Sequence, residues 1–342
     1  MRIGIVTAEY PPDVGGVGDH AARLAHELAA SGHAVQVVTS ARRGYRPCLL
    51  TGGRGGPTGL PWPQDMRIVQ RWDWRIFFAL PRLARRERWD VLHIQYQPGA
   101  YTLHLAINLL PQWLRRSSCS PAIVTTFHDL RVPYVFPKAG PLRRLAVRQL
   151  ARGSHGAIAV AEEDRSQLLA WTRDLRRPPV VEHIPLGNQM DASPPPDFER
   201  TAWRAHLGLP SDAQVVGHFG FVNRSMAVDE LVRAIGLLAG AGRNVHLLMI
   251  GDPLGASDPT NRGYLEAVRR LIADLGLEPR VHWTGTATPE ALAAWLRCLD
   301  VAALPFRDGA SLRRTSIIAA WAHGAPLVTT TPSTPAEWLD EP

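Results

Sequence analysis

Two glycines between a strand-like run and a helix-like run are the first feature with chemical meaning. Gly15 and Gly16 follow Glu9-Tyr10-Pro11-Pro12 and precede a helical pattern that starts near Gly18. Glycine lets backbone N–H groups approach a ligand closely, and the N-terminus of the following helix favours anions such as phosphate. The spacing does not fit the G-x-G-x-x-G pattern of dinucleotide sites. The segment therefore predicts contact with a phosphorylated or polyhydroxylated ligand, although an ordinary βα loop would look the same.

A second candidate site lies between residues 304 and 316, where a strand ends, a loop follows and a helix begins. Its polar residues are Asp308, Ser311, Arg313, Arg314, Thr315 and Ser316. Backbone donors, two guanidinium groups and hydroxyl groups together form a chemically complete site for a diphosphate. The alternative is a helix that Ser311 caps, with both arginines in solvent. We place the arginines in the first helical turn, where a positive charge opposes the helix dipole, and this placement favours a functional role.

A histidine stands where open parallel sheets bind their ligands. His128 follows the strand-like run 122–127, Tyr96 ends the preceding strand-like run, and Asp129 is next in sequence. The imidazole is suited to a hydrogen bond with a substrate hydroxyl or phosphate at the carboxyl end of a strand. Arg224, in the first turn of the second half, is either a phosphate ligand or a surface residue. No set of residues has convincing metal-ligand spacing, so we expect no metal.

Strand-like and helix-like runs alternate along the chain, which predicts parallel sheets covered by helices on both faces. In the first half the strand-like runs cover residues 2–7, 34–39, 66–70, 91–95, 122–127, 156–160 and 180–184. The alternation restarts at residues 214–219, after a proline-rich segment. We therefore predict an α/β fold of two Rossmann-like domains, residues 1–190 and 213–342, joined by a linker over residues 191–212. The default ligand site is a cleft between the two domains.

Charge is unevenly distributed between the halves. Residues 1–190 carry a net charge of +11 and residues 191–342 carry −4. Two arginine clusters contribute, Arg82, Arg85, Arg86 and Arg88, then Arg143, Arg144, Arg148 and Arg152. A basic face of this kind attracts anionic lipid or phosphate-bearing substrates, although a solvated arginine-rich surface is the alternative. No nucleic-acid-binding module is recognisable, so we expect no nucleic-acid partner.

The remaining bulk properties indicate a cellular compartment. The three cysteines are widely spaced and odd in number, which is typical of a reducing compartment. The chain opens directly on a strand-like run and contains no run of 18 apolar residues, so we expect neither a signal peptide nor a transmembrane helix. These features favour a cytoplasmic location, with peripheral contact to the inner face of the membrane as a second expectation.

Taken in order, these segments resemble the family-four glycosyltransferases, which have the GT-B fold. The resemblance covers nearly the whole chain and also includes Ile184-Pro185-Leu186-Gly187-Asn188, Met249-Ile250-Gly251-Asp252-Pro253 and Ala322-His323-Gly324-Ala325-Pro326. It implies transfer of a sugar from a nucleotide-sugar donor with retention of configuration, with the donor on the second domain and the acceptor on the first. It also implies that Gly15 and Gly16 approach the donor phosphates or the acceptor, and that His128 contacts the transferred sugar. Family members usually continue further at the C-terminus, so we expect the second domain to be shortened.

The donor side departs from the family pattern at its basic residues. The family places an arginine and a lysine on the donor phosphate after the first strand of the second domain. Here those positions correspond to Phe221 and Met226, which leaves Arg224 as a substitute.

The acidic residues of the donor side depart as well. The two glutamates of the family motif Glu-x7-Glu correspond to Ser311 and Ala319. We expect Asp308 to take the sugar-binding role and Arg313 or Arg314 to replace the lost phosphate charge. Glu337 matches a family glutamate beyond the Gly324-Ala325-Pro326 turn.

The sequence therefore predicts a metal-independent glycosyltransferase that acts on a sugar or a lipid-linked acceptor in polysaccharide, glycolipid or other glycoconjugate synthesis. The first alternative is a catalytically impaired GT-B homologue that serves as a binding or scaffolding subunit. The second is a sugar-nucleotide epimerase of the same architecture, which fits the Phe127-His128-Asp129 and glycine patterns less well.

Overall fold

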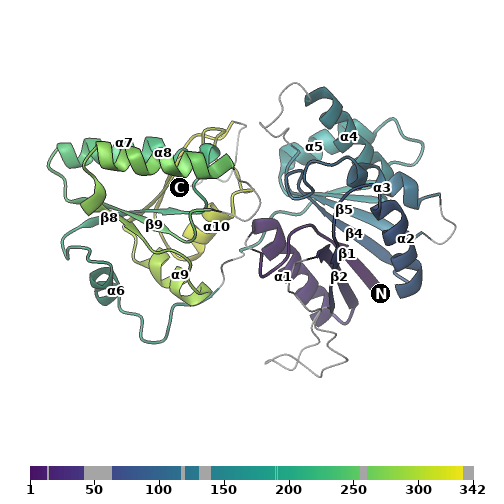
Figure 1. The fold of residues 1–342 in the computed structure, drawn as a ribbon, viewed down its shortest axis with the longest axis horizontal. Coiled ribbons are helices and arrows are strands. Elements are labelled where there is room, and N and C mark those ends of the chain that lie inside the picture. Colours follow the sequence, from purple (N-terminus) through teal and green to yellow (C-terminus); the bar gives the residue numbers. More distant parts are fainter. Residues whose placement is uncertain are drawn as a thin grey trace. The chain divides into compact units, whose positions relative to one another are not determined.

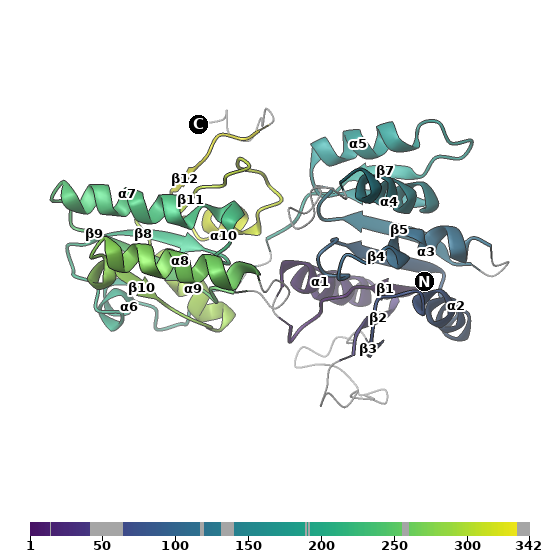
Figure 2. The ribbon, with the colours of Figure 1, turned by 45° about the horizontal axis from the view of Figure 1, so that its top comes forward.

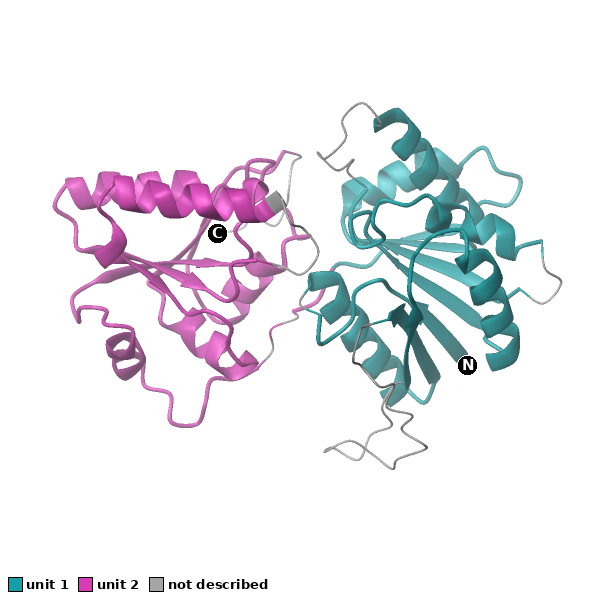
Figure 3. Cartoon of the chain, viewed as in Figure 1, with its two compact units in different colours: residues 1–185 teal, residues 186–342 magenta. Residues whose placement is uncertain are grey.

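The computed structural model describes residues 1–13, 15–41, 64–116, 120–130, 140–188, 190, 192–254 and 260–333. They form two compact units, Met1–Pro185 and Leu186–Pro342 (Figures 1 and 3). Each unit contains one parallel β-sheet with helices on both faces. The prediction of an α/β fold with two Rossmann-like domains is confirmed.

The first unit has a seven-stranded sheet with the order β3-β2-β1-β4-β5-β6-β7, and every pair of neighbouring strands is parallel. The strands are β1 (Arg2–Val6), β2 (Ala34–Ser40), β3 (Gln64–Val69), β4 (Val91–Tyr96), β5 (Ala122–Phe127), β6 (Gly156–Ala159) and β7 (Val180–His183). The helices are α1 (Gly16–Ala30), α2 (Ile76–Glu87), α3 (Ala106–Leu114), α4 (Gly140–Gly153) and α5 (Glu162–Thr172). The strand order reverses between β1 and β4, which makes the carboxyl ends of these strands the expected binding edge.

The two faces of this sheet carry different helices (Figure 2). Helix α1 packs through Ala21, Ala25 and Ala29, which recur every four residues and bring the helix close to β1 and β2. Helices α2, α3, α4 and α5 share the larger hydrophobic core on the other face. A side chain at Gly4 of β1 would collide with the buried Trp89 ring, so the backbone there needs glycine for close packing.

The second unit has a five-stranded parallel sheet with the order β10-β9-β8-β11-β12. The strands are β8 (Gln214–Phe219), β9 (Val245–Ile250), β10 (Val281–Trp283), β11 (Val301–Leu304) and β12 (Leu327–Thr329). The helices are α6 (Arg200–His206), α7 (Val228–Gly240), α8 (Thr260–Asp274), α9 (Pro289–Arg297) and α10 (Thr315–Ala322), with 3-10 turns at η2 (Arg224–Met226) and η3 (Glu278–Arg280). Helices α7 and α8 lie side by side over one face (Figures 1 and 2).

Local sequence explains the start of α9, and packing places α6 in this unit. Thr288 caps α9, because its hydroxyl accepts a hydrogen bond from the Ala291 backbone N–H at 3.3 Å. Threonine is among the residues preferred at this position. Helix α6 lies inside the segment that we expected to be a linker. It belongs to the second unit, where Trp203 packs edge-on against Trp295 of α9 with 4.6 Å between the ring centroids.

Candidate functional site

The glycine turn forms an open helix N-terminus at the carboxyl end of β1. Gly15 is the N-cap of α1 and has extended backbone angles, with φ −178° and ψ 137°. A Cβ on Gly16 would meet nothing within 4 Å, whereas one on Gly18 would lie 3.1 Å from the backbone of Glu9 and Tyr10. Gly18 therefore lets the helix approach the preceding loop closely, and Gly16 is exposed with open space beside its Cα.

Carboxylates flank this helix start. A Cβ on Gly15 would lie 2.5 Å from a carboxylate oxygen of Glu9, so that side chain lies directly against the turn. Protein packed around Asp19 raises its pKa to about 6, and the neighbouring Glu9 adds to the shift. The turn thus places backbone N–H donors beside carboxylate acceptors. A ligand hydroxyl group, which both donates and accepts hydrogen bonds, suits this combination.

An arginine from β3, which the sequence analysis missed, holds the loop before the glycines. The Arg67 side chain is only 2% exposed and lies 3.9 Å from a carboxylate oxygen of Asp13. Its guanidinium also donates to the Pro11 carbonyl and lies over the Tyr10 ring, 5.8 Å from the centroid. Nε of Arg67 also lies 3.2 Å from a carboxylate oxygen of Asp65 in the same strand. The signal in the sequence is an arginine two residues after an aspartate in a short strand, which suits a buried ion pair.

His128 belongs to a chain of hydrogen bonds across β4 and β5. Its Nε2 lies 2.8 Å from Oε1 of Gln95, and Nε2 of Gln95 lies 3.2 Å from Nε2 of His93. His93 in turn lies 2.8 Å from the Thr126 hydroxyl. The ring of His20, from α1, contacts His128 edge-on at 4.9 Å between centroids. The glycine helix and the strand ends therefore meet at one site.

Both histidines of this hydrogen-bonded chain, His93 within β4 and His128 after β5, are neutral at physiological pH. Burial lowers the pKa of His128 to about 3, with further lowering from His20 and His93. Burial likewise lowers the pKa of His93 to about 4. His128 is therefore equipped to exchange hydrogen bonds with a ligand but not to attract one by positive charge.

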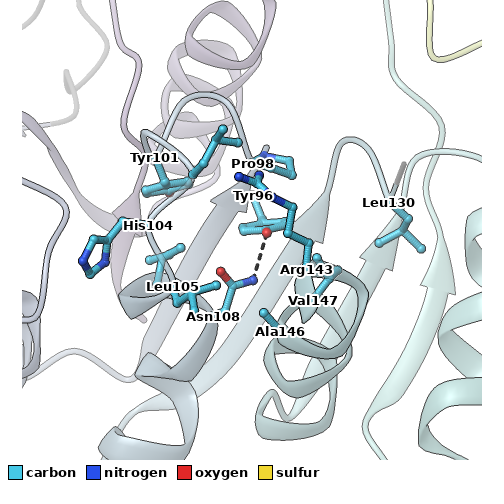
Figure 4. Close-up of a pocket in the computed structure, with 12 residues that line it drawn as sticks. Tyr96, Pro98, Tyr101, His104, Leu105, Asn108, Leu130, Arg143, Ala146 and Val147 are labelled. Atoms are coloured by element: carbon cyan, nitrogen blue, oxygen red, sulfur yellow. Dashed lines mark hydrogen bonds between the residues drawn. The ribbon is translucent and has the colours of Figure 1, made fainter. Parts of the chain in front are cut away.

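The other residues that we expected near His128 have different environments. Tyr96 is 3% exposed, and its hydroxyl accepts a hydrogen bond from Nδ2 of Asn108 at 2.8 Å (Figure 4). Burial raises the pKa of Tyr96 to about 12. The pocket beside it, which Arg143 and His104 also line, has a cavity volume of about 20 Å³. That volume holds about one water molecule and excludes a sugar. Asp129, next to His128, is partly exposed.

In the second unit, Asp308 and Arg314 form an ion pair beyond the carboxyl end of β11. Nη2 of Arg314 donates to both carboxylate oxygens at 2.8 Å. The same guanidinium lies over the Phe306 ring, 4.9 Å from its centroid, and donates to the Ser225 hydroxyl at 3.4 Å. These contacts fix a positive charge beside the loop that follows β8, where the family has its phosphate-binding arginine and lysine.

The helix after this loop begins later than we expected, which corrects one prediction. Residues 311–314 form a turn in which the Arg314 N–H donates to the Ser311 carbonyl at 2.9 Å, and α10 starts only at Thr315. Arg314 is the N-cap residue, so neither it nor Arg313 lies in the first helical turn. The helix-dipole argument for the arginines was therefore wrong, because Thr315 and Ser316 occupy that turn instead.

The loop geometry depends on Ser311 and Gly309. The Ser311 hydroxyl accepts a hydrogen bond from Nε of Arg313 at 3.3 Å. Gly309 has a φ of +83°, and a Cβ there would lie 2.6 Å from the backbone nitrogen of Ser333. Both the left-handed conformation and the close approach require glycine at this position.

Other positions that differ from the family pattern are occupied by core residues. Met226 is 5% exposed and Ala319 is 2% exposed, and each belongs to a hydrophobic core.

Two further predicted site residues lie elsewhere. Arg224 is exposed and borders a surface groove that Arg233 and Arg270 of α7 and α8 also line. Glu337 lies outside the described residues.

The described part of the chain holds neither a cluster of metal ligands nor a membrane-spanning helix. No group of three or more His, Cys, Asp or Glu side chains there is arranged to hold a metal ion. Likewise, none of the helices within the described ranges combines the length and the apolar character that crossing a membrane requires.

Several solved structures share this fold. Sucrose-phosphate synthase from Thermosynechococcus elongatus is 19% identical, with a TM-score of 0.69 over 96% of this chain and 81% of that chain. Anabaena Alr3699/HepE, solved in complex with UDP and glucose, is 17% identical, with a TM-score of 0.69 over 97% and 86%. At these identities the similarity establishes the GT-B fold.

Sequence relatives give the family. The D-inositol 3-phosphate glycosyltransferase of Nocardia farcinica is 27% identical over 89% of this chain and 69% of its own length. That of Mycobacteroides abscessus is 29% identical over 61% of this chain, and the match spans only about half of the relative, 47% of its length. The profile of the glycosyl transferase 4-like domain matches residues 15–187, and that of the glycosyl transferases group 1 matches residues 213–341. The chain belongs to the GT4 family of glycosyltransferases.

Proposed function

We propose that the chain is a glycosyltransferase that moves a sugar from a nucleotide-sugar donor to a sugar or lipid-linked acceptor. The transfer retains the configuration of the sugar, as the family resemblance implies, and serves the synthesis of a polysaccharide, glycolipid or other glycoconjugate in the cytoplasm. Family membership supports the class of reaction, and the solved complexes of Alr3699/HepE with UDP and UDP-glucose support the class of donor.

The observation that carries the proposal is the arginine fixed beside the N-terminus of α10. Arg314 is held by Asp308, Phe306 and Ser225, so its guanidinium is positioned before any ligand arrives. Guanidinium groups bind phosphate bidentately, and a helix N-terminus adds backbone donors. Together they stabilise the negative charge that develops on a diphosphate leaving group. We propose that they do so without a bound metal.

The ion pair also assigns a role to Asp308. When a donor phosphate takes the guanidinium of Arg314, the Asp308 carboxylate loses this ion pair, and its oxygens can accept hydrogen bonds from the sugar hydroxyls. Binding of the diphosphate thereby prepares the acid that orients the sugar. In this scheme Arg313, restrained by Ser311, supplies a second positive charge.

The first unit is proposed to bind the acceptor. Glu9 and Asp19 beside the glycine turn disfavour a further anion but accept hydrogen bonds from hydroxyl groups. The neutral His128 fits the same chemistry, because it exchanges hydrogen bonds without a fixed charge. Gly16 keeps the helix start accessible.

One observation favours the alternative of a binding or scaffolding subunit. Met226 is part of the core where the family has a phosphate-binding lysine, and Ala319 is buried where the family has an acid. Such a subunit would bind ligands without turnover.

A donor screen separates the two functions. We expect release of nucleoside diphosphate from one of the UDP-, GDP- or ADP-sugars. Arg314→Ala should weaken binding of that diphosphate roughly tenfold or more, the value of one charge-assisted hydrogen bond. Asp308→Asn should preserve or tighten diphosphate binding while abolishing sugar release. Arg243→Ala, an exposed arginine of the same unit, is the matched control and should change neither.

Two results would contradict the proposal. Absence of diphosphate release with every donor, together with ligand binding, would favour the scaffolding subunit. Unchanged diphosphate affinity in Arg314→Ala would remove the assigned phosphate site even if turnover occurs.

A further inference from the structure

The outer surface of α2 and α3 exposes large aromatic side chains. Trp74 is 48% exposed, Phe78 is 56% exposed and Trp113 is 36% exposed, and Phe77 lies between them. We call these four residues the aromatic patch. Soluble proteins rarely leave several neighbouring aromatic rings in water, and such patches mark interaction sites.

The rings of the aromatic patch are held in place by one another. Phe77 and Trp113 stack with 5.2 Å between centroids, and Trp74 meets Phe77 edge-on at 5.4 Å. The Trp113 indole N–H donates to the Phe77 backbone carbonyl at 2.7 Å, which ties α3 to α2. The aromatic patch is therefore preformed, and little side-chain conformational entropy is lost when a partner binds to it.

Arginines surround the aromatic patch. Arg82 lies 5.8 Å from the Phe78 ring centroid and Arg116 lies 5.7 Å from that of Trp113. Arg85 continues the exposed face of α2. Among the residues whose positions are given, none of these three arginines has an acidic partner. Within the described ranges, the surface therefore combines exposed rings with positive charge that no acidic side chain pairs.

The arginines of α4, which the sequence also suggested as a basic face, are in a different situation. Arg148 and Arg152 both pair with Asp174, at 3.8 and 2.5 Å. Arg144 lies over the Trp171 ring, 6.0 Å from its centroid. Asp174 thus partly neutralises the positive charge of α4. We therefore expect the arginines around the aromatic patch, which pair with no acid in the described part of the chain, to attract an external anion more strongly.

We propose that the aromatic patch and its arginines bind the surface of an anionic lipid bilayer. Tryptophan and phenylalanine insert at the level of the lipid head groups, while arginine pairs with anionic phosphates there. A second copy of the chain fits this surface less well, because a twofold contact would bring the arginine rim of each copy against that of the other. This inference rests on the patch itself and goes beyond the proposed reaction.

The surface also adjoins the pocket at the end of β4. Trp74 contacts His104 edge-on at 5.0 Å, and His104 lines that pocket (Figure 4). A bilayer on the aromatic patch would therefore hold lipid head groups near the carboxyl edge of the first sheet. This is where a lipid-linked acceptor would need to arrive.

Vesicle flotation of the full chain tests the proposal. We expect it to float with vesicles of phosphatidylcholine mixed with phosphatidylglycerol and to remain unbound with phosphatidylcholine alone. Arg82→Glu with Arg116→Glu should lower the partition coefficient roughly tenfold or more. Trp74→Ser with Phe78→Ser should also lower it roughly tenfold, because two inserted rings are lost.

Matched controls keep the test specific. Arg176→Glu with Arg177→Glu makes the same charge change on exposed arginines of the same unit, and Leu237→Ser removes an exposed apolar side chain of the second unit. Both should float like the unmodified chain.

Three results would overturn the proposal. These are equal binding to neutral vesicles, equal losses in the control variants, and a dimer in solution that Trp74→Ser with Phe78→Ser dissociates. Diphosphate release without vesicles should be unchanged in every variant, so a negative flotation result leaves the proposed reaction untouched.

Discussion

Acid should destabilise the first unit through two buried histidines, one within β4 and one after β5. His93 and His128 have pKa values of about 4 and about 3 in the folded chain, below the ordinary value of 6.5. The unfolded chain therefore takes up protons first as the pH falls. Stability from these groups is complete above about pH 6.5 and is lost as the pH falls toward the folded-state values.

The size of the loss follows from these pKa values. One pKa unit corresponds to about 1.4 kcal/mol, so each histidine should lower the free energy of unfolding by about 2 kcal/mol between pH 7 and pH 5. The two together give about 4 kcal/mol. This is a large fraction of the stability of an ordinary domain.

Urea unfolding at pH 7 and pH 5 measures the effect, and a double variant isolates it. In His93→Gln with His128→Asn, amides replace the two imidazoles and retain partners for Thr126 and Gln95. The unmodified chain should lose about 4 kcal/mol more than the variant over this pH interval, because the contributions of all other groups cancel in the comparison. Equal losses in the two proteins would refute the reasoning and would mean that the histidines are protonated without unfolding.

Three further substitutions test the second unit. Gly309→Ala should lower the free energy of unfolding by about 2 kcal/mol, because alanine is strained at a φ of +83°. Urea titration measures this free energy, and an unchanged value would show that the loop adopts another conformation without cost. Gly217→Ala should cost about 1–3 kcal/mol in the same assay, because its Cβ would collide with the buried Leu299, unless that side chain repacks. Met226→Lys should not strengthen binding of a nucleoside diphosphate and should destabilise the unit by about 3 kcal/mol, since it buries a charge. Calorimetric titration showing tighter binding would contradict the assignment of this position to the core.

The architecture was predictable because its signals are local and repeated. Buried runs such as residues 122–127 and 245–250 alternate with helical patterns, and that alternation alone indicates parallel sheets. The cap at Thr288 could be predicted for the same reason, since a capping residue acts within three positions of itself. Family membership then followed from the order of short motifs along the chain.

The site was less predictable because its contacts join distant residues. Arg67 holds the loop at residues 10–13 from a strand more than 50 positions away, and no local pattern links the two segments. The start of α10 was misplaced because the turn at residues 311–314 depends on hydrogen bonds within the loop. The aromatic patch was missed, because exposure of Trp74 and Trp113 depends on how α2 and α3 pack.

The ion pair between Asp308 and Arg314 has a consequence for the effect of ionic strength. A protein that binds phosphate with an unpaired arginine loses affinity steeply as salt is added, because dissolved ions compete for the exposed charge. Arg314 already holds an anion within the fold, at 2.8 Å, so an arriving phosphate replaces one negative partner with another. The number of dissolved ions around this residue then changes little on binding. The affinity for a diphosphate should accordingly vary only weakly with salt concentration, which would keep the donor bound across a wide range of ionic conditions.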